Sequence, residues 1–218
     1  MELDIIDVLP PHRADAFARR MKERSDLWVD RGGFYTIGAS TYLDSPAFYP
    51  VFAAYTNPVL EHLLHELQYD VMDALPKRFV PDRARRLHGT AVMGVHVFDF
   101  KSNGQQGNPH IDEPFKRIDW GVTFSNPFSF TLALELPAVG GGLDYWSTWT
   151  DEEIDTYHKH DSLPIAERLA YDVGKMYVHD GLTPHRIANF GDMTPTEHRI
   201  TIQGHGVTLA DGITAIYF

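Results

Sequence analysis

Beyond residue 90 the sequence divides into short β-prone runs separated by turn-forming residues, and this pattern restricts the chain to a mainly β fold. The runs are residues 91–100, 128–136, 143–146, 175–178, 198–203 and 212–218. Segments rich in Gly, Pro and Asn, such as 102–109 and 139–142, separate them, as is typical of strands joined by turns. Many short strands of this kind predict a sandwich, jelly roll or barrel with helices packed outside.

The first third of the chain has a mixed character. A helix is expected over residues 11–27, where apolar side chains recur at helical spacing. The aromatic and β-branched segment 33–38 predicts a strand. A second helix is expected to begin after Asn57, with Pro58 at its first position, and to end at Pro76. The apolar positions of the first helix are Ala14, Phe17, Ala18 and Met21.

The length of the chain suits one domain. A chain of 218 residues can enclose a single substantial core, and neither a linker nor a repeat divides it. We therefore expect one domain over residues 1–218, in which residues 1–89 form a helical and strand-containing buttress. Residues 90–218 would form the β core. Residues 151–170 look like a polar insertion with one short helix.

Composition excludes several classes of protein. The chain has no cysteine, so disulfides, thiolate metal sites and iron–sulfur clusters are excluded. A formal net charge of −11 argues against nucleic-acid binding, which needs clustered Lys and Arg, but is compatible with a cationic substrate. No apolar stretch is long enough to span a bilayer and no secretory leader is visible. These features predict a cytoplasmic protein that binds no membrane.

Two histidines and one carboxylate are placed where they could meet a single metal ion. His110 and Asp112 are two residues apart, so on an extended segment both side chains point to the same face. His185 follows the turn at residues 180–184 and would approach from a strand edge. Such a set leaves the opposite coordination positions open, as in the facial arrangement of non-haem Fe(II) oxygenases.

Other histidines compete with this assignment. The His-x-Asp pattern alone is weak evidence, because the chain has 12 histidines and 30 acidic residues. His179, six positions before His185, is the alternative third ligand, although a place beside the site suits it better. Three more histidines are expected to be packed or directed away from the site, and these are His96, His198 and His205. Surface or loop positions are expected for His62, His65, His158 and His160.

The spacing of these residues resembles that of the Fe(II)/2-oxoglutarate-dependent dioxygenase superfamily. The resemblance consists of His110-x-Asp112, His185 within PHRI, and Arg199 fourteen residues later within HRITIQGHG. The run LELPAVGGGLDYW is similar to the strand–turn–strand that separates the two ligand motifs in that superfamily. The match extends over about residues 90–210 and indicates no particular subfamily.

The resemblance implies a double-stranded β-helix, or jelly roll, with iron at one open end. His110, Asp112 and His185 would hold Fe(II), with 2-oxoglutarate and O2 as co-substrates. Arg199 would bind the distal carboxylate of 2-oxoglutarate through its planar charged fork, and Thr201 would add a hydroxyl. The implied reaction is decarboxylation of 2-oxoglutarate to succinate coupled to hydroxylation of an unactivated C–H bond. The presence of Asp112 favours hydroxylation over halogenation.

The substrate is less well indicated. We expect a small molecule, with an amino acid or amine as the first candidate because Glu113, Asp119 and Asp144 lie near the motif. Strand alternation nevertheless directs Glu113 away from the metal, and Arg186, a second possible carboxylate anchor, away from the pocket. Aromatic side chains expected around the iron are Trp120, Tyr145 and Trp146, and loops 101–109 and 147–163 are expected to act as lids.

Two alternatives to a small-molecule oxygenase stay open. One is a hydroxylase of a peptide or protein side chain. The other is a cupin-like metal-binding or ligand-binding protein without oxygenase activity, which would have no need of Arg199 as a carboxylate anchor. The oligomeric state is not indicated by the sequence.

Overall fold

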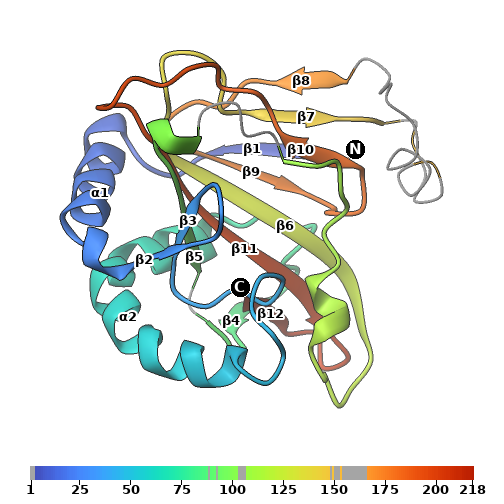
Figure 1. Cartoon of the computed structure of the whole chain (residues 1–218). Helices are drawn as coiled ribbons and strands as arrows, with labels where there is room; N and C mark the ends of the chain where they lie inside the picture. Colours follow the sequence, from blue (N-terminus) through green and yellow to red (C-terminus); the bar gives the residue numbers. More distant parts are fainter. Residues whose placement is uncertain are drawn as a thin grey trace.

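In the computed structural model a nine-stranded sheet forms the frame of the molecule (Figure 1). The structure describes residues 3–218 apart from 88, 92, 103–106, 148, 150–152 and 154–165. The strands of this main sheet are β1 (Leu3–Asp7), β2 (Trp28–Asp30), β3 (Tyr35–Ile37), β4 (Ala84–Arg86), β5 (Gly94–Phe98), β6 (Phe124–Glu135), β9 (Lys175–His179), β11 (Arg199–Leu209) and β12 (Thr214–Tyr217). They run in the order β1-β9-β6-β11-β5-β3-β2, and β12 pairs with both β11 and β4.

A second, three-stranded sheet lies near the β1–β9 edge of the main sheet (Figure 1). Its strands are β7 (Leu143–Tyr145), β8 (Glu167–Leu169) and β10 (His185–Ile187), in the order β10-β7-β8. All pairs in both sheets are antiparallel except β12 with β4. The predicted class, mainly β with flanking helices, is confirmed.

The alternation of side chains along β11 gives the main sheet two different faces. Ile200 and Ile202 point into the hydrophobic core, which also contains buried side chains of α1 (Pro11–Glu23) and α2 (Tyr49–Ala74). Arg199 and Gln203 lie on the other face, because successive side chains of a strand point to opposite sides. Both residues line a cavity. The helices therefore cover the apolar face of the sheet, and the polar face is left for a site.

The first helix agrees with the prediction, whereas the start of the second was wrong. All four predicted apolar residues of α1 are buried. The helix α2 begins at Tyr49 rather than after Asn57, and Pro58 lies inside it. Tyr49 and Ala53 pack against Phe218, and the Tyr49 hydroxyl donates to the Phe218 carbonyl. This packing extends the helix through a residue that lacks a backbone donor. The predicted end near Pro76 is confirmed.

The sequence analysis did not identify five short strands, which are β1, β2, β4, β8 and β10. Three of them, β1, β2 and β4, join the N-terminal third to the sheet of the core strands. Of these, β1 pairs with β9, and β2 reaches the core strand β5 through β3. Residues from the N-terminal third thus extend the same sheet as the core strands. This pairing supports our proposal that residues 1–218 form one domain.

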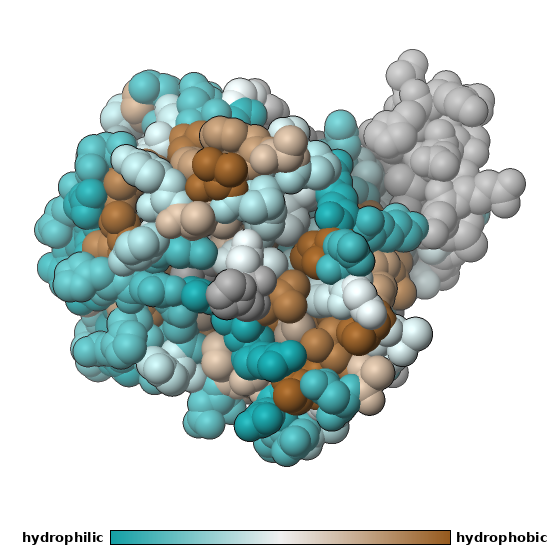
Figure 2. All heavy atoms as spheres, turned by 90° about the horizontal axis from the view of Figure 1, so that it is seen from below, coloured by the Kyte–Doolittle hydropathy of each residue, from teal (hydrophilic) through white to brown (hydrophobic). Residues whose placement is uncertain are grey.

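The outer surface mixes polar and apolar residues. Figure 2 shows hydrophobic patches separated by hydrophilic surface on the face seen from below, and exposed Phe48, Val51 and Tyr55 contribute apolar surface on α2. Over the ranges that the structure describes, no helix is both long and apolar enough to cross a membrane. The helix expected within 151–170 and most of the expected lid at 147–163 lie outside the described residues, as do His158 and His160.

Candidate metal and co-substrate site

His110, Asp112 and His185 converge at one end of the space between the two sheets. Each offers one ligand atom, and these atoms all lie within 4.8 Å of one another. The Nε2 atoms of His110 and His185 are 3.6 Å and 3.4 Å from the two carboxylate oxygens of Asp112. In the part of the chain that the structure describes, this is the one group of three such residues close enough to share a metal ion.

Backbone hydrogen bonds place the three residues. The amide of His110 donates to the carbonyl of His185 and the amide of His185 to that of His110, each at 2.9 Å, so the two form an isolated antiparallel bridge. The amide of Asp112 donates to the carbonyl of Gly181 at 2.7 Å. Gly181 has φ +72°, and a Cβ there would lie 3.0 Å from Ser129 Oγ and 3.3 Å from Asp112 Cβ. Glycine therefore permits both the turn and the close approach.

The two imidazoles of the group are oriented by their Nδ1 atoms. Nδ1 of His110 lies 2.8 Å from the Asn108 carbonyl, and Nδ1 of His185 lies 2.7 Å from the Thr183 carbonyl. A carbonyl only accepts, so both Nδ1 atoms carry a proton, and in the neutral form of each ring Nε2 keeps its lone pair. Metal-binding histidines are commonly held in this way. The donor set of two imidazoles and one carboxylate fits Fe(II) with open coordination positions.

His179 is less suited to be the third ligand. Its ring is buried beside that of His185, with centroids 4.8 Å apart. Its Nδ1 accepts the amide N–H of Gly181 at 3.1 Å, so the neutral ring carries its proton on Nε2. Burial, followed by the neighbouring His185, lowers the pKa of His179 to about 3. A neutral His179 thus has no lone pair left for a metal, and the geometry favours His185.

The site is strongly polarised. Burial raises the pKa of Asp112. The charge of His185 and its hydrogen bond to the carboxylate lower this pKa by more than burial raises it, so the net pKa lies well below the usual value. Conversely, burial lowers the pKa of His185, and Asp112 more than compensates, so its net pKa is raised. A metal ion would displace the proton on Nε2 of charged His185 and would occupy the position of that proton beside the Asp112 carboxylate.

A cavity of about 720 Å³ opens beside the three residues. Side chains from both sheets line it, and they include Arg199, Leu143, Phe98 and Tyr171. A volume of this size is in the range of pockets that enclose small molecules. The cavity therefore has room for a small ligand next to the candidate metal site.

Arg199 is the most unusual residue of this cavity. It is 1% exposed, and within the described residues no carboxylate pairs with it. Its Nε donates to the Gly141 carbonyl at 2.8 Å and one terminal nitrogen to Thr201 Oγ1 at 3.4 Å. Burial lowers its pKa to about 10, so it stays charged at neutral pH. A buried charge without a partner is unfavourable, which indicates an anionic ligand. Thr201 is not among the cavity-lining residues and instead contacts the guanidinium.

Several other predicted residues lie elsewhere. Trp120, Tyr145 and Trp146 do not line the cavity. Arg186 pairs with Asp144 at 3.4 Å, away from the cavity as predicted. Glu113 was expected to point away and instead lines the cavity, because it has φ −116° and ψ 32° and begins the short helix η3 (Pro114–Arg117). The alternation of an extended strand therefore stops before it.

The cavity wall includes residues that the sequence analysis missed, and three of them are His96, His205 and Tyr42. His96 and His205 are buried and line the cavity, although they were expected to be ordinary strand residues. His96 Nε2 lies 2.7 Å from the Tyr42 hydroxyl, and His205 Nδ1 lies 2.9 Å from Ser129 Oγ. His205 shares the strand parity of Arg199, so alternation along β11 was a usable signal for it. Nothing in the local sequence indicated Tyr42.

Comparison with known proteins identifies the fold. No family model matches the sequence, and no curated protein matches it. Solved structures do match. An N-substituted L-amino acid dioxygenase from Burkholderia ambifaria AMMD is 16% identical with a TM-score of 0.62, and the match covers 99% of this chain and 86% of that one. Its complex with α-ketoglutarate (2-oxoglutarate) matches at 16% identity over 100% of this chain and 86% of that one, with a TM-score of 0.61.

Two further structures are more distant. HygX from Streptomyces hygroscopicus, with nickel and 2-oxoglutarate bound, is 14% identical over 93% of this chain and 82% of its own, with a TM-score of 0.52. The non-heme α-ketoglutarate-dependent epimerase SnoN from nogalamycin biosynthesis is 14% identical over 93% and 76%, with a TM-score of 0.53. At these identities the match establishes the fold alone. The chain has the jelly-roll fold of the 2-oxoglutarate-dependent oxygenases, and the resemblance predicted from the sequence is confirmed at the level of the fold.

Proposed function

We propose that the protein is an Fe(II)- and 2-oxoglutarate-dependent oxygenase that hydroxylates an unactivated C–H bond of a small molecule. The observation that carries this proposal is Arg199, a buried cation without an anionic partner among the described residues. It lines the same cavity as His110, Asp112 and His185. A ligand that pairs with Arg199 and also binds a metal at the three residues would fit this cavity. 2-Oxoglutarate supplies one carboxylate for Arg199 and another to chelate the metal.

Each residue has a distinct role in the proposal. His110, Asp112 and His185 hold Fe(II), with both imidazoles fixed through Nδ1. Iron bound there would allow O2 to act as the oxidant: one oxygen atom would enter succinate as 2-oxoglutarate loses CO2, and the other would be inserted into the substrate C–H bond. Arg199 binds the distal carboxylate of 2-oxoglutarate.

The surroundings of Arg199 suit this role. Its guanidinium lies 5.5 Å from the centroid of the Phe98 ring and 5.9 Å from that of Tyr171. The two rings and the Gly141 carbonyl fix its position and exclude water, so a carboxylate there meets an ordered donor in a medium of low dielectric constant. Thr201, buried behind the guanidinium, adds a hydroxyl contact to the arginine.

A small-molecule substrate is favoured over a protein side chain. The cavity lies between two sheets, whereas a peptide would need a long open groove. The similar dioxygenase from Burkholderia ambifaria acts on N-substituted L-amino acids, which supports the amino-acid class as the first to screen. A metal-binding protein without oxygenase activity would have no use for an unpaired Arg199.

The test is anaerobic addition of Fe(II) and 2-oxoglutarate, followed by the visible metal-to-ligand charge-transfer band. We expect the band in the wild-type protein, its loss in His110→Ala and a higher 2-oxoglutarate requirement in Arg199→Met. The control is His62→Ala, which changes a histidine on α2 outside the cavity and should leave the band unchanged. A folded wild-type protein that shows no band would contradict the proposal.

A further inference from the structure

We infer that the substrate carries a carboxylate group and that Arg117 binds it at the mouth of the cavity. This inference rests on the proposed function, because it places a second ligand beside the iron and 2-oxoglutarate. It differs from the first expectation of a basic substrate. The inference is based on the charged side chains that line the cavity.

Three Lys and Arg side chains among the described residues line the cavity, and two of them already have a partner or a role. They are Lys116, Arg117 and Arg199. Lys116 pairs with Glu113, and Arg199 is assigned to 2-oxoglutarate. Arg117 donates from one nitrogen to the carbonyls of Thr41 and Tyr42, both at 3.2 Å, and no carboxylate contacts it in the described parts of the chain. Arg117 is therefore the basic group left for a further anion.

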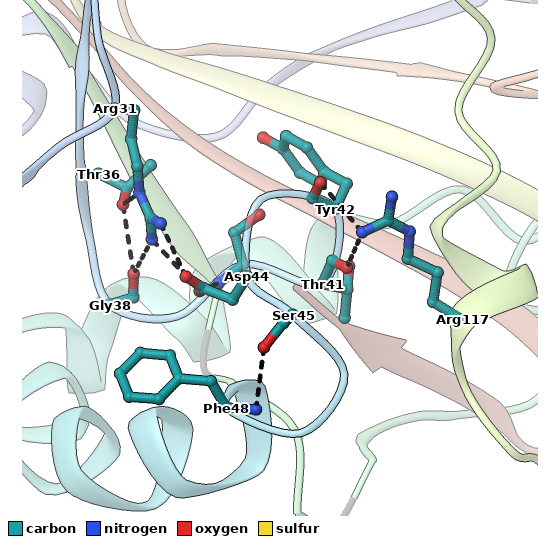
Figure 3. Close-up of polar contacts among 10 residues, drawn as sticks. Arg31, Thr36, Gly38, Thr41, Tyr42, Asp44, Ser45, Phe48 and Arg117 are labelled. Atoms are coloured by element: carbon teal, nitrogen blue, oxygen red, sulfur yellow. Dashed lines mark hydrogen bonds and ion pairs between the residues drawn. The ribbon is translucent and has the colours of Figure 1, made fainter.

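The guanidinium of Arg117 is held at one end and free at the other. Figure 3 shows both hydrogen bonds leaving the same terminal nitrogen, while the second terminal nitrogen points away from the two carbonyls. An arginine presents five N–H donors in a planar fork that matches a carboxylate. One edge of the group is thus fixed by the protein, which reduces the conformational entropy lost when a ligand binds the other edge.

The segment that holds Arg117 is itself anchored. Arg31 and Asp44 form an ion pair at 2.7 Å with side chains 10% and 6% exposed, and Asp44 also accepts the amide of Ser40 at 2.7 Å. Figure 3 shows this pair beside the loop that carries Thr41 and Tyr42. The two carbonyls that bind Arg117 therefore belong to a fixed loop rather than to a free one.

Tyr42 connects Arg117 to the metal site. Its carbonyl accepts from Arg117 and its hydroxyl lies 2.7 Å from His96 Nε2. Burial, and then the charge of Asp112, raise the pKa of Tyr42, so the phenol remains a neutral wall group near the candidate iron ligands. Arg117 follows Asp112 by five residues, on η3. A substrate bound to Arg117 would thus extend along Tyr42 towards the metal.

The rest of the wall fits an organic acid with an apolar body. Phe34, Leu43 and Ile111 supply apolar surface to the cavity. His205 is 5% exposed, and its Nε2, like Nδ1 of His96, has no hydrogen-bond partner among the described residues. The cavity wall therefore offers buried polar atoms to a ligand. An unpaired buried polar atom is unfavourable until a ligand meets it.

The acidic residues that suggested a basic substrate are already paired. Glu113 binds Lys116, and Asp144 binds Arg168 and Arg186. Asp119 accepts the amide of Gly121 at 3.1 Å within a turn and does not line the cavity. Together Fe(II), Asp112, 2-oxoglutarate and Arg199 carry no net charge. The positive charge of Arg117 therefore favours a substrate with a negative charge.

The test uses matched acids and amides as probes. N-acetyl-L-leucine and N-acetyl-L-leucinamide differ in the carboxylate but share the apolar body, and hexanoate with hexanamide form a second pair. Each is titrated into the anaerobic Fe(II)–2-oxoglutarate protein while the charge-transfer band is recorded. Each is also titrated by ligand-observed NMR into the metal-free protein in an Arg199→Met background, so that the acids cannot bind at Arg199. We expect the wild type to bind the acids about 10 to 100 times more tightly, as a charged hydrogen-bonded pair predicts.

Three variants complete the design. Arg117→Met should abolish the preference for acids and leave amide binding unchanged, and Arg117→Lys should restore part of the preference. Lys101→Met, which removes an exposed basic side chain outside the cavity, should keep it.

Four results would overturn the inference. The first three are equal binding of acids and amides, a preference that survives in Arg117→Met, and no acid binding at millimolar concentration. The fourth is an equal weakening of acid and amide binding in Arg117→Met, which would indicate a purely structural residue. The band formed before substrate is added should be the same in Arg117→Met as in wild type. Absence of that band in wild type would contradict the proposed function, while the NMR titration still tests Arg117.

Discussion

Replacing Arg199 with methionine should weaken the binding of 2-oxoglutarate strongly and leave the stability of the ligand-free protein nearly unchanged. Burial lowers the pKa of Arg199 from 12.5 to about 10, and such a shift corresponds to roughly 3 kcal/mol against the charged form. The protein keeps that charge because the folded pKa stays well above neutral pH. Arg199→Met removes this penalty and also removes the hydrogen bond to Gly141, which contributes about 1.5 to 3 kcal/mol.

The two terms nearly cancel in the ligand-free state. The free energy of unfolding of metal-free, 2-oxoglutarate-free Arg199→Met should therefore lie within about 1 kcal/mol of the wild-type value. Binding of 2-oxoglutarate should be weakened about 100-fold, since a charge-assisted pair with the distal carboxylate is lost. Ordinary buried ion pairs behave differently, because removing one partner destabilises the protein by about 3 to 5 kcal/mol.

Urea denaturation of the metal-free protein measures the effect on stability, and urea denaturation with anaerobic Fe(II), with and without 2-oxoglutarate, measures the effect on ligand binding. At a concentration about 100 times Kd, 2-oxoglutarate should stabilise the wild type by about 2.7 kcal/mol and the variant by less than about 0.5 kcal/mol. The matched control is Arg186→Met, which loses its pairing with Asp144 and should unfold more easily while keeping the 2-oxoglutarate response. If ligand-free Arg199→Met were destabilised by more than about 3 kcal/mol and still responded fully to 2-oxoglutarate, Arg199 would be a structural residue.

Three further predictions follow from the described contacts. His185→Gln should abolish Fe(II) binding, whereas His179→Gln should weaken it less than about tenfold; a metal titration giving the reverse ranking would exclude the assignment. Arg31→Met leaves Asp44 buried and unpaired, so urea denaturation should show a loss of about 3 to 5 kcal/mol, and a loss below about 1 kcal/mol would contradict a buried pair. Burial lowers the pKa of His96 from 6.5 to about 3. Between pH 6.5 and about pH 3 the imidazole of residue 96 is therefore protonated in the unfolded chain and neutral in the folded protein. The free energy of unfolding should fall as pH decreases through that range. Between pH 7 and pH 5 the wild type should lose about 2 kcal/mol more than His96→Gln, and parallel pH curves for the two proteins would count against a neutral buried imidazole.

Patterns that depend on one element were predictable from the sequence. The four apolar residues of α1 follow helical spacing, and all are buried. Along β11 the alternation of polar and apolar residues separates Arg199 from Ile200, and the structure places them in the cavity wall and the core respectively. In both cases the local period determines which side chains are buried, so no knowledge of the rest of the chain is needed.

Features that depend on distant partners were not predictable. The first turns of α2 are stabilised by Phe218, which is 169 residues from Tyr49 in the chain, and this contact outweighs the expectation that Pro58 begins the helix. Strands of three residues, such as β10, are too short for a side-chain period to show. The choice between His179 and His185 depends on which backbone group meets each Nδ1, and a sequence pattern carries no information about that.

The reciprocal hydrogen bonds between His110 and His185 have a consequence for how this scaffold can change. The main chain, rather than the metal, holds these two residues side by side, so the apoprotein should accept and release ions without refolding. The identity of the third donor is then separable from the architecture. Replacing the Asp112 side chain would alter the coordination chemistry, while the hydrogen bond from the backbone amide of residue 112 to the Gly181 carbonyl would still hold the loop in place. The coordination chemistry could therefore be redesigned at the side chain of residue 112 alone, while the backbone hydrogen bonds that position the three residues are retained.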